Sequence, residues 1–133
     1  MPAPLPPVGE QSITWIYTPD LEATCMFYAA RLGLTQVFDQ GLCRLYRWSP
    51  TGFLGVCQVR PGRHVEPKGV VITLVTPDVD GWYRHVLDRG IDVEGPPQLS
   101  AQFNVYSFFV RDPNGYKLEF QTFRDPRWRE ATA

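Results

Sequence analysis

Hydrophobic and polar positions follow a pattern that occurs twice along the chain. Apolar and β-branched residues dominate residues 12–17 and again residues 70–75, which predicts a strand in each place. Each strand precedes a stretch of helical character, residues 21–32 in the first half and residues 79–89 in the second. A set of short strands then follows each helix. We expect these at about 35–39, 43–48 and 53–60 in the first half, and at about 92–94, 105–111 and 117–123 in the second.

Short motifs mark the helix ends in both halves. The segment TPDLE at residues 18–22 recurs as TPDVD at residues 76–80. Asp20 and Asp78 therefore stand where a helix N-cap is needed, and a glycine follows each helix where a left-handed residue commonly ends it. Because one βαβββ unit cannot bury its own sheet, the repeat predicts an α+β fold of two tandem βαβββ modules.

The length of 133 residues fits one domain. We expect a proline-rich N-terminal arm at residues 1–10 and a tail at 124–133. The domain between them spans 11–123, as module one (11–60), a polar linker (61–68) and module two (69–123).

Composition narrows the choice of partners and location. Thirteen Lys and Arg residues against fourteen Asp and Glu residues give a net charge of −1, which argues against a nucleic-acid-binding surface. There is no apolar run of bilayer length, so we expect no membrane partner. The N-terminus lacks the pattern of a signal peptide, and three cysteines without C-x-x-C spacing are expected to be reduced thiols. These features predict a cytoplasmic protein.

A longer motif connects the repeat to a known family. The segment DPNGYKLEF at 112–120, with PDLE at 19–22, FY at 27–28 and LGL at 32–34, resembles the vicinal oxygen chelate superfamily of glyoxalases, bleomycin resistance proteins and extradiol dioxygenases. The resemblance covers residues 11–123. It implies a curved mixed sheet around a cavity, and a homodimer in which modules share sites across a two-fold interface.

The resemblance also implies where a divalent metal would bind, with one ligand on the first strand and one on the last strand of each module. Those positions fall on Ile13, Val56, Val71 and Glu119. Three of the four are aliphatic, and a catalytic divalent site generally needs about three protein ligands. We therefore expect no metal cofactor. The histidines do not replace the missing ligands, because His64 lies in the linker and His85 is expected to face solvent.

Strand alternation indicates what the cavity would hold instead. On the first strand Ile13, Trp15 and Tyr17 share one face, and the superfamily geometry turns that face to the cavity. The predicted site combines such aromatic residues with a few polar groups, as small-molecule sites generally do. The alternative that the aromatic residues only fill the sheet core stays open. The predicted ligand-binding residues are Trp15, Tyr17, Gln58, Thr73, Glu119 and Gln121.

Glu119 is the candidate for chemistry. A carboxylate in an apolar cavity must be paired, hydrogen-bonded or protonated, and Arg44 or Arg47 would be a suitable partner. If Glu119 is unpaired, it becomes a candidate general base or a hydrogen-bonding anchor. The leading hypothesis is metal-independent binding of a small, partly aromatic molecule. The alternatives are a lyase or dioxygenase with a non-standard metal site, and a metal-free enzyme that uses Glu119 as acid or base, so whether this protein is an enzyme stays open.

Overall fold

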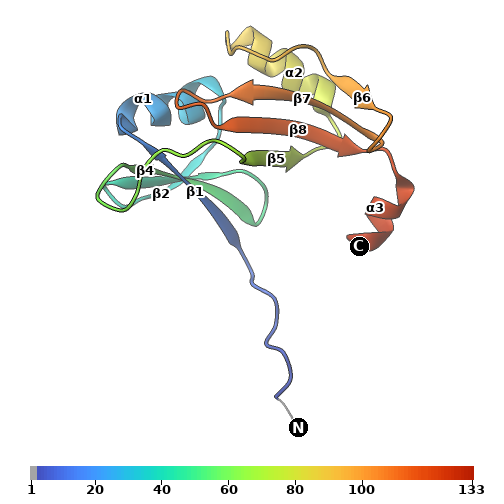
Figure 1. Cartoon of the computed structure of the whole chain (residues 1–133), viewed down its shortest axis with the longest axis horizontal. Helices are drawn as coiled ribbons and strands as arrows, with labels where there is room; N and C mark the ends of the chain where they lie inside the picture. The colour runs from blue at the N-terminus through green and yellow to red at the C-terminus, as the bar shows by residue number, and fades with distance from the viewer. Residues whose placement is uncertain (1–2) are drawn as a thin grey trace.

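The computed structural model describes residues 3–133, whose strands form two mixed four-stranded sheets accompanied by short helices (Figure 1). The first half contains β1 (Ser12–Thr18), α1 (Leu21–Met26), the π-helical segment η1 (Phe27–Arg31), β2 (Gln36–Asp39), β3 (Cys43–Arg47) and β4 (Gly52–Gln58). The second half contains β5 (Val71–Val75), α2 (Val79–Asp88), β6 (Gln98–Ser100), β7 (Val105–Arg111) and β8 (Lys117–Phe123), and α3 (Pro126–Ala131) follows.

The two sheets have the same topology, which confirms the predicted pair of βαβββ modules. Their strand orders are β1-β4-β3-β2 and β5-β8-β7-β6. In each sheet the first strand runs parallel to the last strand of its module, and the remaining neighbours are antiparallel. β1 and β5 therefore each form one edge of a sheet.

The predicted helix caps are confirmed. The Asp20 carboxylate accepts a hydrogen bond from the Ala23 N–H, and the Asp78 carboxylate accepts one from the Gly81 N–H. Gly33, beyond the first helical stretch, has a φ of +87°, a left-handed conformation that favours glycine.

The helical stretch expected over residues 21–32 is present, but it is α-helical only to Met26 and continues as the π-helical η1, where the Leu32 N–H donates to the Phe27 carbonyl. One local prediction was wrong. The strand expected at 92–94 is absent from the described residues as a strand: only Val93 forms an isolated bridge, to Val110, and the edge strand lies later, at β6. Gly95, Pro96 and Pro97 separate the two segments, and a proline has no N–H for a sheet ladder.

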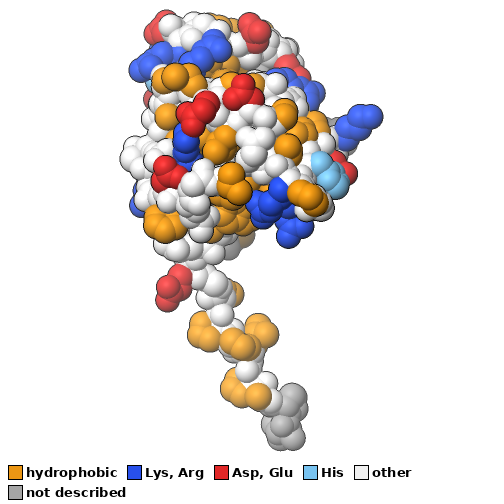
Figure 2. Space-filling view, turned by 90° about the vertical axis from the view of Figure 1, so that its left-hand side faces the viewer, with side chains coloured by type: hydrophobic (Ala, Val, Ile, Leu, Met, Phe, Trp, Pro, Cys, Tyr) orange, Lys and Arg blue, Asp and Glu red, His pale blue; other side chains and the backbone are white. Residues whose placement is uncertain are grey.

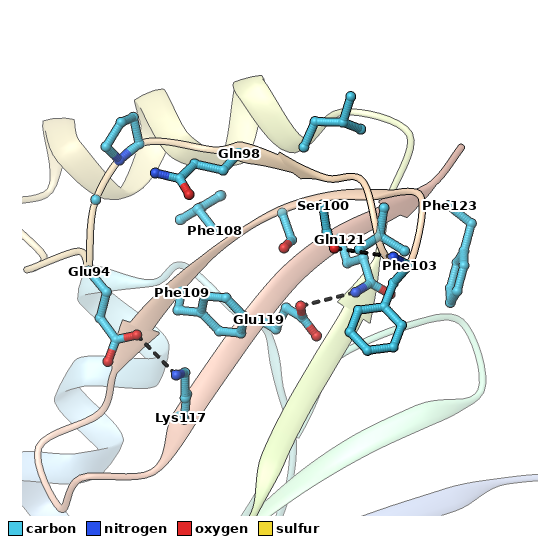
Figure 3. A pocket seen from close by; sticks show the side chains of 15 residues that line it. Glu94, Gln98, Ser100, Phe103, Phe108, Phe109, Lys117, Glu119, Gln121 and Phe123 are labelled. Carbon is cyan, nitrogen blue, oxygen red and sulfur yellow. Dashed lines mark hydrogen bonds and ion pairs between the residues drawn. The ribbon is translucent and has the colours of Figure 1, made fainter. Parts of the chain in front are cut away.

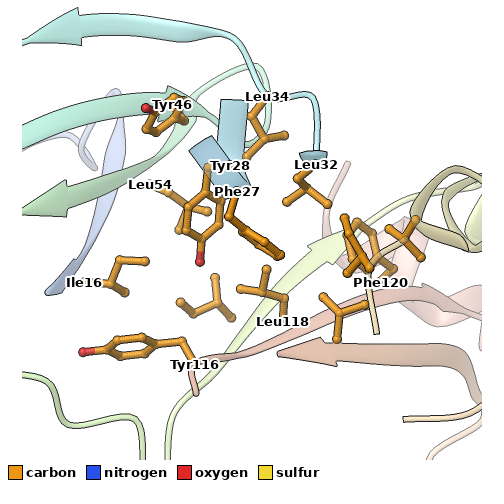
Figure 4. Packing of buried hydrophobic residues seen from close by; sticks show 14 of the residues in the cluster. Ile16, Phe27, Tyr28, Leu32, Leu34, Tyr46, Leu54, Tyr116, Leu118 and Phe120 are labelled. Carbon is orange, nitrogen blue, oxygen red and sulfur yellow. The ribbon is translucent and has the colours of Figure 1, made fainter. Parts of the chain in front are cut away.

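One shared core lies between the modules (Figure 4). Each sheet contributes its helix-facing side chains, as alternation requires, and the aromatic rings of Phe108 and Phe120 stack with 4.9 Å between their centroids. The most deeply buried large side chains of this core include Ile16, Tyr28, Leu32, Tyr46, Leu54, Val56, Phe108, Val110, Leu118 and Phe120. The opposite face of each sheet therefore points away from the core.

Polar contacts also join the modules. The Tyr28 hydroxyl donates to the buried Asp112 carboxylate at 2.8 Å, and burial, with the adjacent Asp112, raises the pKa of Tyr28 well above its usual value. His85 was expected to face solvent, but its Nε2 lies 2.8 Å from the Leu32 carbonyl oxygen, so this histidine joins the two helical regions. Arg89 adds a bond to the Ala30 carbonyl.

The segments at the two chain ends differ. Residues 3–10 run outside any helix or strand and project from the body, with Leu5 89% exposed (Figures 1 and 2). The C-terminal segment is helical at α3, and Trp128 stacks on Phe123 with 4.1 Å between ring centroids.

The expectation of three reduced thiols was wrong. Cys43 and Cys57 face each other on β3 and β4 and form a disulfide, and Cys25 is a buried free cysteine. The Gln58 N–H bonds to the Leu42 carbonyl next to this pair, so the cysteines occupy a non-hydrogen-bonded position, where opposing side chains come closest. The spacing of the cysteines in the sequence did not reveal this pair, because the register of β3 on β4 brings them together.

Candidate ligand-binding groove

Three of the predicted site residues lie together on the outer face of the second sheet. In the parallel pairing of β5 and β8, Thr73 lies opposite Glu119, and Val75 lies opposite Gln121. Glu119 and Gln121 are two residues apart on β8, so their side chains leave the same face. The face opposite to them carries Leu118 and Phe120, which are fully buried in the core.

This outer face is hollowed into a groove of about 690 Å³ (Figure 3). Its size falls within the range usual for small-molecule sites. Aromatic rings and a few polar side chains supply its walls. Its lining residues are Glu94, Gly95, Pro96, Gln98, Leu99, Ser100, Phe103, Val105, Ser107, Phe108, Phe109, Lys117, Glu119, Gln121 and Phe123. All of them come from the second module.

The Glu119 carboxylate accepts two hydrogen bonds from uncharged donors. The Thr73 hydroxyl donates to one carboxylate oxygen at 2.7 Å. The Gln121 amide donates to the other at 3.0 Å (Figure 3). Arg44 and Arg47, the two possible partners of Glu119 considered from the sequence, bind other groups. Arg44 binds Glu22, and Arg47 donates to the Pro50 carbonyl, because both arginines belong to the first sheet.

One end of the groove carries a separate charged cluster. Lys117 Nζ lies 3.2 Å from the Glu94 carboxylate and 4.3 Å from the centre of the Phe109 ring, while Arg111 Nε lies 3.0 Å from the same carboxylate. Partial burial would raise the pKa of Glu94, but the bonds from Lys117 and Arg111 outweigh it and lower the pKa. Both cations are therefore engaged by a carboxylate. Lys117 at the start of β8 is part of the groove lining.

Trp15 and Tyr17, which were also predicted to bind the ligand, lie on the first sheet, away from the groove. They project from the outer face of the first sheet, opposite the core-facing Ile16, and neither lines the groove. The Trp15 indole lies against Gly55 so closely that a Cβ at that glycine would overlap the ring. Trp15 is 41% exposed, so it does not simply fill the core.

The expectation that Gln58 lines the cavity was wrong. Its side-chain amide donates to the Pro19 carbonyl at 2.8 Å, and its carbonyl oxygen accepts from the Leu21 N–H at 3.2 Å. Gln58 therefore leaves the helix-facing side of the first sheet and fixes the start of α1. Leu54 and Val56, which alternate with it, are buried in the core on that side.

The register also corrects one of the four implied metal positions. The turn motifs align Val56 with Glu119, but Trp15 pairs with Gly55 where its counterpart Thr73 pairs with Glu119. Gly55 is therefore the structural equivalent of Glu119. The motif alignment fails because β4 already pairs at Gly52, whereas β8 begins only at Lys117, beyond the glycine of its turn.

These four positions do not fit a divalent metal ion. Ile13, Gly55 and Val71 have no side-chain atom that can bind a metal, and the space over Gly55 is occupied by the Trp15 indole. Only Glu119 offers a ligand oxygen, against about three protein ligands in a usual catalytic site. Among residues 3–133, no group of three or more His, Cys, Asp and Glu side chains is placed to hold a metal.

Several groove residues were not predicted from the sequence. Ser107 and Phe109 lie opposite Gln121 and Glu119 in the pairing of β7 with β8. The strand at 105–111 was predicted, and alternation along it would have placed both residues on the face of Glu119. Gln98 and Ser100 were missed for another reason, since the edge strand was expected at 92–94.

The family is shown by comparison with known proteins. Residues 11–120 match the sequence model of the Glyoxalase/Bleomycin resistance protein/Dioxygenase superfamily, and the chain therefore belongs to that superfamily. The comparison with curated proteins gave no match.

Solved structures share the fold at low sequence identity. A glyoxalase/bleomycin resistance protein/dioxygenase from Nocardioides is 22% identical, with a TM-score of 0.71, over 92% of this chain and 88% of that one. Lactoylglutathione lyase from Agrobacterium tumefaciens is 23% identical, with a TM-score of 0.68, over 88% and 95%. TioX from Micromonospora sp. ML1 is 17% identical, with a TM-score of 0.71, over 86% and 98%. These similarities establish the fold, and the chemistry has to be argued from the groove.

Proposed function

We propose that this protein binds a small, partly aromatic organic molecule in the groove on the outer face of the second sheet, without a bound metal. The observation that carries the proposal is the groove itself, where aromatic rings surround a few fixed polar groups. Such a site needs only shape and hydrogen bonds to retain a ligand. The names of the similar structures include a lyase and a bleomycin resistance protein. Binding is favoured over metal-dependent catalysis here because the four implied metal positions do not offer a fitting set of ligands.

We propose further that two copies of this protein form a homodimer, and that the ligand lies between the two copies. The groove is walled by the second module alone, while the aromatic outer face of the first module lies on a separate surface of the same chain. Trp15 and Phe38 on that face are 41% and 58% exposed. A second copy would use this face to cover the groove, which removes both apolar surfaces from water.

One alternative has support in the same groove. Glu119 has its carboxylate oriented by Thr73 and Gln121, and an oriented carboxylate facing a ligand is suited to move a proton. A metal-free enzyme that uses Glu119 as acid or base is therefore the second candidate. The metal-dependent alternative requires ligands beyond the four positions described above.

The test combines binding with blocking of the groove. Aromatic and glycopeptide-like compounds are screened by thermal shift, and the affinity of each hit is measured by calorimetry. Ser107→Trp places a large ring in the groove and is expected to weaken binding at least tenfold. Arg84→Trp, on the exposed side of α2, is the matched control.

Three outcomes separate the candidates. Equal affinity of the wild type and Ser107→Trp would contradict the proposed groove. Loss of affinity after chelation, restored by one metal ion per chain, would favour the metal-dependent alternative over the proposal. Turnover of a bound compound that is lost in Glu119→Gln would identify the metal-free enzyme.

The cytoplasmic location stays a prediction. Among residues 3–133, no helix is long and apolar enough to cross a membrane.

A further inference from the structure

The two carboxylates of the groove, Glu94 and Glu119, differ in whether a cation of the chain pairs with them. Within residues 3–133, every ion pair at the groove involves Glu94, which has Lys117 and Arg111 as partners. Glu119 takes part in none, since its two hydrogen bonds come from a hydroxyl and an amide. Each Glu119 oxygen has a second acceptor position, so the carboxylate retains capacity for a donor that the described chain does not supply.

The positive charges close to the groove are already engaged. Lys117 binds Glu94 and covers the Phe109 ring. Arg111 divides its donors between Glu94 and the Gly115 carbonyl. An anionic group placed beside Glu119 would be repelled by the carboxylate and would have to displace Glu94 to gain a cation. A protonated amine at the same place would gain a charge-assisted hydrogen bond.

The aromatic side chains of the groove also favour a positively charged ligand near Glu119. Phe103 and Phe123 line the same groove as Glu119, while the ring of Phe109, opposite Glu119 across β7 and β8, is already covered by Lys117. An aromatic ring attracts a positive charge to its face, and that attraction grows when water is excluded. Phe103 is 69% exposed on the loop at the groove entrance, so its ring is accessible to a ligand's apolar body.

We propose that the ligand of this groove is an organic amine, in which a protonated nitrogen binds Glu119 and an aromatic body lies against the groove phenylalanines. This inference rests on the proposed function and specifies the ligand's charge. Glu119 stands at one of the positions where the resemblance to the superfamily implies a metal ligand. Here the carboxylate would bind an organic cation in place of an inorganic one.

Three matched probes test the charge preference: 1-naphthylmethylamine, 1-naphthylmethanol and 1-naphthoic acid. They share one ring system and differ in charge at neutral pH. On the wild type, we expect the amine to bind about tenfold or more tightly than the acid, with the alcohol between them, as measured by calorimetry. Raising the salt concentration should weaken amine binding and leave alcohol binding almost unchanged.

A control variant separates the effect of the Glu119 carboxylate from the effect of the protein's net charge. Glu119→Gln is expected to abolish the preference for the amine. Glu22→Gln removes the same charge from α1, outside the groove, and should retain it. Glu119→Asp, which keeps the charge, should preserve the direction of the preference. If Glu119→Gln fails to fold, the Glu119→Asp and salt measurements still decide the question.

Failure of the inference differs from failure of the proposed function. If all three naphthyl probes bind the wild type equally, or if Glu119→Gln keeps the amine preference, the amine assignment is overturned while groove binding stands. If the probes fail to bind and the wider compound screen also yields no ligand that Ser107→Trp blocks, the proposed function itself fails.

Discussion

The absence of a side chain at Gly55 lets the Trp15 ring lie close against the outer face of the first sheet. The Gly55 backbone lies beneath the Trp15 indole, with no room for a Cβ. An alternating strand pattern alone would allow any small residue here. The requirement arises only because Trp15 pairs with Gly55 in the parallel register of β1 and β4.

Gly55→Ala is therefore expected to displace the Trp15 ring and to lower the free energy of unfolding by about 1–3 kcal/mol, the usual cost of overpacking. Urea unfolding measures this change. In Gly55→Ala combined with Trp15→Ala the clash is gone, so the combined loss should be smaller than the sum of the two single losses. Additive losses in that cycle would contradict the close approach of ring and glycine.

At the scale of single elements, sequence patterns predicted what depends on near neighbours. Asp20 and Asp78 were placed correctly as caps because a capping bond spans only three residues. β7 and β8 were predicted with their observed bounds, because each is a continuous apolar or alternating run.

What depends on pairing between strands was not predictable in the same way. Val56 was aligned with Glu119 because the turn motifs match, yet the pairing that starts at Gly52 makes Gly55 the equivalent residue. Gln58 was assigned to the wrong face by the same one-residue difference, since such a slip moves every side chain of a strand to the opposite face. Thr73, Glu119 and Gln121 were assigned to the same face by alternation along each strand, and the pairing of β5 with β8 places Thr73 opposite Glu119.

The disulfide belongs to this scale too, because it joins β3 to β4. We expect the chain isolated without reductant to yield one alkylated cysteine after unfolding, Cys25, as counted by mass spectrometry. Breaking the cross-link between Cys43 and Cys57 relaxes a constraint on the unfolded chain across a separation of 14 residues. Reduction should therefore lower the free energy of unfolding by up to about 3 kcal/mol.

The control for the disulfide is the double variant Cys43→Ser with Cys57→Ser, whose unfolding should be insensitive to reductant. Recovery of three alkylated cysteines from protein that was never exposed to reductant would contradict the cross-link. It would restore the original expectation of reduced thiols and, with it, the simplest argument for a cytoplasmic location.

At the scale of the whole molecule, each sheet has one face that the shared core does not cover. In the second sheet this face carries the groove, and in the first sheet it carries Trp15. The shared core lies on the helix-facing side of each sheet, so the groove and the Trp15 face cannot cover each other within one chain. A chain that leaves Ile13, Trp15 and Phe38 partly in water would gain from a partner on that face.

Light scattering should therefore give a solution mass near twice the chain mass of 15.2 kDa. Ile13→Asp places a charge on the outer face of β1, and in a two-fold dimer every contact occurs twice, so this variant should shift the mass toward one chain. Met26→Asp introduces the same charge at an exposed position of α1 and should leave the dimer intact. Because the partner's first module would cover the groove, Ile13→Asp should also bind ligand less tightly than Met26→Asp. A wild-type mass near 15.2 kDa at all working concentrations would refute the dimer and leave the groove as an open, one-chain site.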